Sequence, residues 1–158
     1  MVHLDVRNES ARRGLWRRDV LQRLAERICA GEGVCEDVEL SLLFCDDPFI
    51  TELNRQYRNK PHATDVLAFQ QPGKTCHGVR VLGDIVISLE SVERFCGGDR
   101  AAMRQEIRLL FSHGLLHLLG VTHGDAAATR RMKDKQAQYL GKNPEDVWHY
   151  TKTAARRQ

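Results

Sequence analysis

Three histidines stand close together late in the chain, at His113, His117 and His123, with Gly120 between the second and the third. Residues four apart lie on one face of an α-helix, so the first two imidazoles can point at one position. Glycine readily takes the left-handed conformation that ends helices, so Gly120 predicts a turn that returns His123 to the same place. Three neutral imidazoles with an open fourth position form the donor set of a catalytic zinc site. The spacing therefore predicts one Zn²⁺ per chain.

The same spacing also matches the zinc-peptidase pattern H-E-x-x-H-x-x-G-x-x-H, in which the glutamate is the general base. Here Gly114 occupies the glutamate position. A lone histidine on an apolar helix is usually a core residue, but three with a helix-ending glycine between them favour a metal site. The motif therefore predicts a metal and argues against peptide hydrolysis.

Composition indicates one soluble domain spanning residues 1–158, with 42% hydrophobic and 28% charged residues. The start of the chain lacks the apolar run of a secretory signal. The most apolar stretch, 107–121, is too short and too polar to span a bilayer, and it predicts a buried helix. Five cysteines without C-x-x-C spacing favour reduced thiols over a disulfide or cysteine-zinc framework. We therefore expect a cytoplasmic protein with no membrane contact.

The net charge is only +3, yet basic residues cluster near residues 12–18, 130–135 and 156–157. Each cluster alone is typical of a solvated helix face or a tail. Together they are compatible with a polyanionic partner. A further stripe of Arg100, Arg104 and Arg108 lies on the helix face opposite His113, and we expect it to face solvent.

Hydrophobic periodicity predicts four strands and five helices. Val2, Leu4 and Val6 alternate with polar residues, and the same alternation marks the second strand. Asp46 and Asp99 are expected to cap the helices that follow them. The expected strands are 2–7, 36–44, 64–69 and 79–88, and the expected helices are 15–30, 46–57, 89–96, 99–118 and 126–140, with a polar loop over 70–78.

Four motifs occur in a fixed order: Tyr57-Arg58, T-D-V-L-A-F over 64–69, G-D-I-V-I-S over 83–88, and the histidine motif. This arrangement resembles the YbeY family, bacterial metal-dependent endoribonucleases, over about residues 38–140. The resemblance implies an α+β domain, with a small mixed β-sheet packed on a central metal-carrying helix and additional helices. It also implies that the zinc ligands are His113, His117 and His123, and that the catalytic residues are His113 and the arginine at Arg58.

Two positions depart from the family pattern. The family has an aspartate immediately before its third histidine, where this chain has Thr122, and Asp125 follows two places after that histidine. Asp125, and with weaker support Asp65 or Asp84, could orient a ligand histidine through its second ring nitrogen. The residues 61–63 replace a tight charged turn of the family, which bears on how Arg58 is presented.

The resemblance implies a zinc-dependent endoribonuclease that prefers single strands. It would act in ribosomal RNA maturation at the 3′ end of the small-subunit RNA and in ribosome quality control. The implied partners are ribosomal RNA, the ribosome or its small subunit, and ribosomal proteins or a GTPase. A zinc centre lowers the pKa of bound water toward about 7, so the reaction needs no carboxylate base at the position of Gly114. Arg58 can bind phosphate oxygens in a bidentate way. Two alternatives stay open: a metal-dependent hydrolase of another ester or amide, and a non-catalytic ribosome-associated metal-binding module.

Overall fold

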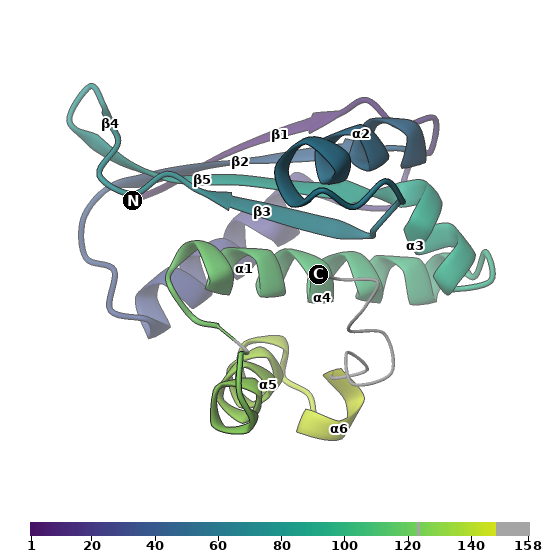
Figure 1. Cartoon of the computed structure of the whole chain (residues 1–158). Coiled ribbons are helices and arrows are strands. Elements are labelled where there is room, and N and C mark those ends of the chain that lie inside the picture. The colour runs from purple at the N-terminus through teal and green to yellow at the C-terminus, as the bar shows by residue number, and fades with distance from the viewer. Residues whose placement is uncertain (123, 148–158) are drawn as a thin grey trace.

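A five-stranded mixed sheet forms the middle layer of the protein (Figure 1), and the computed structural model describes residues 1–122 and 124–147. The strand order is β1-β2-β5-β3, with β1, β2 and β5 parallel, β3 antiparallel to β5, and β4 pairing with β5 off this path. The strands are β1 Val2–Asn8, β2 Val38–Cys45, β3 Val66–Gln70, β4 Thr75–Cys76 and β5 Val79–Ser88. The helices are α1 Arg18–Gly31, α2 Asp47–Arg58, α3 Leu89–Phe95, α4 Arg100–Leu118, α5 Ala126–Leu140 and α6 Pro144–Val147.

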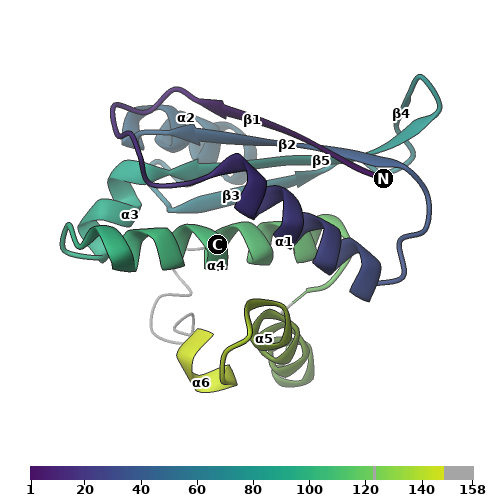
Figure 2. The same ribbon diagram turned by 180° about the vertical axis from the view of Figure 1, so that it is seen from behind.

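Helices cover both faces of the sheet, because its strands carry apolar residues on both sides. Helices α1 and α4 lie on one face, as the front and back views show (Figures 1 and 2), and α2 lies on the other. On β2, Leu40, Leu42 and Phe44 join the main core against α1 and α4. Cys45 joins the smaller cluster beneath α2. The predicted mixed sheet beside a central helix is confirmed.

The central helix α4 is largely buried, as expected for the stretch 107–121. Its core-facing residues include Ile107, Leu110 and Phe111, each at most 1% exposed. The carboxylate of Asp99 caps the helix as predicted, accepting from the backbone N–H groups of Ala101 and Ala102 at 3.0 and 3.2 Å. A long, rigid helix therefore runs beneath the sheet and ends at the histidine motif.

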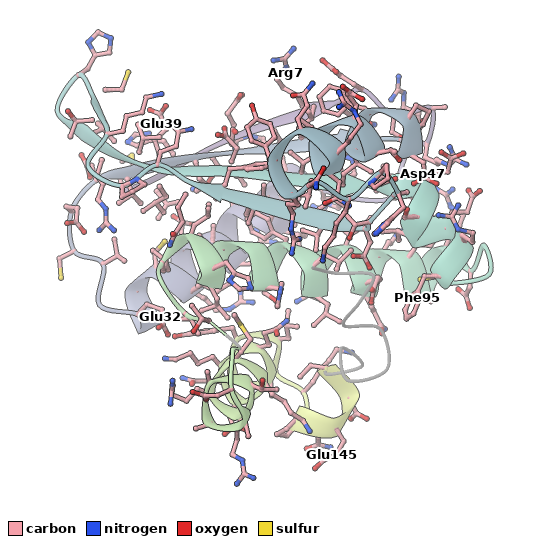
Figure 3. All side chains as sticks on the ribbon, viewed as in Figure 1. Arg7, Glu32, Glu39, Asp47, Phe95 and Glu145 are labelled. Atoms are coloured by element: carbon pink, nitrogen blue, oxygen red, sulfur yellow. The ribbon has the colours of Figure 1, made fainter. Side chains whose placement is uncertain are left out.

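Helix α5 is attached to the end of α1 through Glu32 (Figure 3). The Lys135 ammonium lies 3.0 Å from the Glu32 carboxylate, and the Tyr139 hydroxyl donates to the same group. Gly31 is required here because a Cβ would lie 2.3 Å from the Tyr139 hydroxyl oxygen. These contacts hold α5 against the rest of the fold on the side of α4 away from the sheet.

Several local expectations were wrong in instructive ways. Helix α1 begins at Arg18 rather than near residue 15, yet Leu15 is 1% exposed and Trp16 stacks on Phe44 with ring centroids 5.0 Å apart. Asp46 is the N-cap residue of α2, as expected, but its side chain makes no capping hydrogen bond. Its carboxylate instead accepts from the Ser10 hydroxyl at 2.7 Å, the Ala11 N–H and the Arg12 guanidinium. The loop 70–78 contains strand β4, and helix α6 was not expected.

No helix among the described residues is both long enough and apolar enough to cross a membrane.

Candidate metal centre

A pocket of about 410 Å³ opens where strand β3 passes over the last turns of α4. Its polar lining comes from Arg58 at the end of α2, Gln70 at the end of β3, and His113 and His117 on α4. The strand residues 66–68 form an apolar wall, and Thr122 and Gly124 complete the rim. The pocket thus gathers chemistry-bearing residues from four segments of the chain.

The two helical histidines point their outer ring nitrogens at one another. Nε2 of His117 lies 3.1 Å from Nε2 of His113, and the rings meet edge to face at 78°. Two nitrogen ligands of a tetrahedral zinc ion at ordinary bond lengths stand about 3.3 Å apart. His113 is 3% exposed, so its ring is shielded from water. The donor atoms and their separation therefore fit a bound metal ion.

Gln136 of α5 contacts His113 on the Nδ1 side of its ring. Its side-chain amide nitrogen lies 3.3 Å from the Leu109 carbonyl oxygen and 3.4 Å from the Ser112 hydroxyl. Its amide oxygen lies 3.5 Å from Nδ1 of His113. Because the amide nitrogen has acceptors, the oxygen faces the imidazole and favours a proton on Nδ1. That tautomer leaves the lone pair of Nε2 directed into the pocket.

The end of α4 is fixed from the sheet side. The Gln70 amide donates to the carbonyl oxygen of His117 at 2.8 Å, joining the end of β3 to the last turn of the helix. Gly120 follows with φ at +93°, the left-handed conformation predicted to end the helix. The Gln70 amide therefore ties the backbone that carries His117 to the end of β3.

Gly114, at the position where zinc peptidases carry their glutamate, lies against the sheet. A Cβ built there would stand 3.0 Å from Cγ2 of Ile85, whose side chain is fully buried. Glycine therefore allows α4 to approach β5 closely, and no carboxylate occupies this position.

Arg58 is the last residue of α2 and lines the pocket. Partial desolvation lowers the pKa of its guanidinium from the ordinary value, but arginine remains charged at neutral pH. No carboxylate pairs with it among residues 1–122 and 124–147. Asn59 ends the helix at φ +57°, and Asn54 donates to the His62 carbonyl at 3.0 Å. With this turn in place of the family's charged turn, Arg58 lines the pocket.

Asp84, one of the predicted orienting carboxylates, lines a different hollow of the protein. Asp84 faces the α2 side of the sheet, because its neighbour Ile85 faces α4 and successive strand residues alternate. It accepts hydrogen bonds from the Ser41 hydroxyl and from the Gln71 amide, the latter at 2.6 Å. Among the described residues its hydrogen bonds therefore go to the α2 side of the sheet, and an orienting role for Asp84 toward a ligand histidine stays a prediction.

Asp125 is the N-cap residue of α5, and its carboxylate accepts from the Ala128 N–H at 2.7 Å. Its carboxylate therefore caps α5, and its orienting role toward a ligand histidine stays a prediction. Asp65 is 1% exposed immediately before β3, and its carbonyl oxygen accepts from the Ser88 N–H at 2.9 Å. Its position beside the pocket wall leaves its orienting role as a prediction.

His123, the third predicted ligand, lies outside the described residues. Within 1–122 and 124–147, no three histidine, cysteine or acidic side chains are grouped closely enough to hold a metal. The three-histidine centre therefore stays a prediction, of which the structure brings two members together.

Sequence reasoning missed Gln136 and Gln70. Gln136 had a detectable signal, because it shares the helical spacing of the buried residues Met132 and Tyr139. A polar side chain on an apolar helix face needs a partner inside the protein. Gln70 had no such signal, because it follows an apolar strand at the start of a polar loop.

Comparison with known proteins places these features in one family. The Endoribonuclease YbeY family matches residues 5–143. An Endoribonuclease YbeY of Pelotomaculum thermopropionicum is 40% identical over 127 residues, covering 78% of this chain and 84% of the relative. One from Moorella thermoacetica is 38% identical over 128 residues, covering 76% and 82%. The solution structure of TM1509 from Thermotoga maritima has a TM-score of 0.60 at 25% identity, covering 96% of this chain and 93% of that one.

The family match spans nearly the whole described chain, including Arg58, the pocket strand β3 and the two convergent histidines, so this protein belongs to the Endoribonuclease YbeY family.

Proposed function

We propose that this protein is a zinc-dependent endoribonuclease that cleaves single-stranded regions of ribosomal RNA. The observation that carries the proposal is the 3.1 Å convergence of the Nε2 atoms of His113 and His117 in a pocket shared with Arg58. A cation and a guanidinium in one pocket suit a substrate that carries negative charge at the reacting group. A phosphodiester has that charge, and an amide does not.

His113, His117 and, by the sequence motif, His123 would hold the metal. When bound, the ion supplies Lewis acidity, which polarises a phosphoryl oxygen and activates water for attack. Arg58 binds the non-bridging phosphate oxygens and offsets the charge that builds up on them. Gln136 holds His113 in the tautomer that keeps Nε2 available. The apolar wall formed by residues 66–68 limits water on the sheet side of the pocket.

The alternatives are less well supported by the geometry. Hydrolysis of an amide by the peptidase route needs a carboxylate at position 114. Here that position is a glycine that packs against Ile85. A purely structural metal site usually has four protein ligands and no open pocket. The predicted ligand set has three, and the pocket beside it is open to a substrate.

The place of the reaction in the cell is inferred from the family. We propose maturation of the 3′ end of small-subunit ribosomal RNA and ribosome quality control as the setting. The partners would be the ribosome or its small subunit, together with ribosomal proteins or a GTPase. The cytoplasm is the corresponding compartment. The name of the family supports the RNA-cleavage part of these proposals.

Elemental analysis and RNA cleavage on the same protein samples test the proposal. The parent should contain about one zinc per chain and cut a single-stranded ribosomal RNA fragment. The His117→Ala variant should lose both metal and cleavage. His62→Ala, which removes an exposed histidine outside the pocket, is the matched control and should keep both. Loss of metal with unchanged cleavage would mean that a copurified nuclease produced the activity, and the proposal would fail.

A further inference from the structure

A second pocket, of about 450 Å³, lies between the start of α1 and the face of α4 that points away from the histidines. Figure 2 shows this side of the molecule, with α1 in front of α4. Arg104 and Arg108 of α4 line it together with Trp16 and Arg17, and Leu15 and Ile107 contribute apolar wall. Arg100 and Arg104 of the arginine stripe are exposed, as expected, whereas Arg108 is half-buried. Arg104 and Arg108 border the hollow.

The charge in this pocket is of one sign. Its described lining contains three arginines and no carboxylate. The Arg17 guanidinium lies 2.9 Å from the carboxylate of Asp19, which does not line the pocket, and both side chains are exposed. A surface pair of this kind contributes little and leaves most guanidinium donors available. Like charges gathered in one hollow repel each other, so an anion that enters it is favoured.

The arginines also have hydrogen-bond donors to offer. Arg104 uses one nitrogen on the Gly14 carbonyl oxygen, at 3.4 Å. The buried Nε of Arg108 has no acceptor among the described residues. The protein itself therefore leaves the Arg108 guanidinium incompletely hydrogen-bonded. Guanidinium groups match the geometry of phosphate oxygens in particular.

Trp16 adds an aromatic surface to the same pocket. Its indole stacks on Phe44 at 5.0 Å with 25° between the ring planes, so its orientation is fixed by the core. The half-buried ring also lines the pocket beside Arg17. Aromatic side chains bind nucleobases by stacking or edge contact, and this works for every base. A ligand with both a phosphate and a planar base fits this combination.

The pocket is separate from the candidate metal site. Arg104 and His113 are nine positions apart on α4, which puts them about 180° apart around the helix and about 13 Å apart along it. No residue lines both pockets. A volume near 450 Å³ is within the usual range for small-molecule sites.

We propose that this Arg–Trp pocket binds one phosphate-bearing nucleotide unit, with the phosphate on Arg104 and Arg108 and the base against Trp16. The unit comes either from a single-stranded RNA or from a free mononucleotide. If the unit comes from RNA, the inference rests on the proposed function, and the pocket is a second substrate-binding site of the enzyme.

Titration of the full chain with uridine monophosphate, inorganic phosphate and a twelve-nucleotide single-stranded RNA tests the pocket. Calorimetry gives the affinities, and fluorescence in a Trp148→Phe protein reports on Trp16 alone. The RNA arm uses His117→Ala protein, so that the strand is not turned over. Uridine monophosphate should bind and change the Trp16 emission, whereas phosphate alone should bind more weakly.

Arg108→Gln should weaken nucleotide binding about tenfold to a hundredfold, since it removes hydrogen bonds from a charged donor. Arg130→Gln is the matched control, because it removes one positive charge from an exposed site on α5. Arg108→Lys keeps the charge but not the planar geometry and should recover only part of the affinity. Thermal melts show whether each variant is folded. Much tighter binding of the RNA than of the mononucleotide identifies the strand as the source, and equal affinity identifies the free nucleotide.

The proposal is overturned if neither nucleotide nor RNA changes Trp16 emission, or if Arg108→Gln and Arg130→Gln weaken binding equally. Equal losses would mean nonspecific attraction to the net charge. The outcome is independent of cleavage. If the protein binds nucleotide through Arg108 but does not cut RNA, the nucleotide pocket is supported and the proposed function is contradicted.

Discussion

The side-chain oxygen of Gln136 lies 3.5 Å from Nδ1 of His113, joining helix α5 to the histidine pair of α4. Gln136 is fully buried, and its amide nitrogen faces the Leu109 carbonyl oxygen and the Ser112 hydroxyl. The amide is therefore oriented by three partners at once. We infer that this glutamine is a positioning residue, which sets the tautomer and the ring orientation of His113.

Replacing Gln136 with leucine removes the acceptor while keeping a side chain of similar size. Zinc affinity, measured by competition with a chelator, should fall about tenfold to a hundredfold, the usual effect of losing a partner of a metal-binding histidine. Gln138→Leu changes an exposed glutamine on the same helix and should leave the affinity unchanged. Equal affinities for the parent and Gln136→Leu would show that the contact does not orient the ring.

Arg58→Ala should lower kcat for RNA cleavage by about a hundredfold or more, because it removes a charged donor from the reacting phosphate. Zinc content should not change, since Arg58 lines the pocket but arginine is not a zinc ligand. Arg55→Ala is the control, because Arg55 lies on the same helix and pairs with Glu52 at the surface. A loss of activity of the same size in both variants would contradict the assigned role of Arg58.

Gly114→Ala should lower the free energy of unfolding by about 1 kcal/mol. Overpacking against Ile85 costs about 1–3 kcal/mol, and the better helix propensity of alanine returns about 1 kcal/mol. In an Ile85→Ala background the added methyl has room, so the same change should become neutral or stabilising. Denaturant unfolding of the four proteins measures this coupling, and additive effects would argue against the close contact.

Asp47 at the start of α2 should contribute stability that is lost in acid. Burial raises the pKa of this carboxyl, but hydrogen bonds from Ser91, Ser88 and Arg94 outweigh it, and the net pKa is lowered. The contribution is complete above the unfolded-state pKa of about 3.9 and disappears as pH falls through the lower folded-state pKa. The parent should be more stable than Asp47→Asn at neutral pH, and the difference should shrink below about pH 4.

A stability difference between the parent and Asp47→Asn that stays constant down to pH 2 would exclude this titration as its cause. The exposed Asp134 of α5 offers a control, and Asp134→Asn should show no comparable pH-dependent difference.

Residue spacing predicted the elements that carry the site, because these are set by local preferences. The buried character of α4, the cap at Asp99 and the left-handed Gly120 all follow from nearest neighbours along the chain. The motifs of the resemblance added Arg58, which spacing alone would have left as a surface residue. Both helical histidines and this arginine indeed line one pocket.

The positions that could not be predicted depend on the three-dimensional arrangement. Whether Asp84 faced α4 or α2 depended on which face of β5 packs on the metal-carrying helix, and that is decided by Gly114 against Ile85. Asp46 had the right residue type for a cap, but the segment at 10–12, remote in sequence, took its carboxylate. Arg104 and Arg108 were placed on the correct helix face, but the hollow beside them required the docking of α1.

The direction of α4 has an electrostatic consequence for the histidine pair. The peptide dipoles of its 19 residues sum to about half a negative charge at the carboxyl end, where His113 and His117 lie. That field attracts a cation before any ligand bond forms, and it repels a phosphate group. The same helix end that favours the metal thus opposes the proposed substrate, so the charge of Arg58, delivered from α2, offsets a penalty that the fold itself imposes.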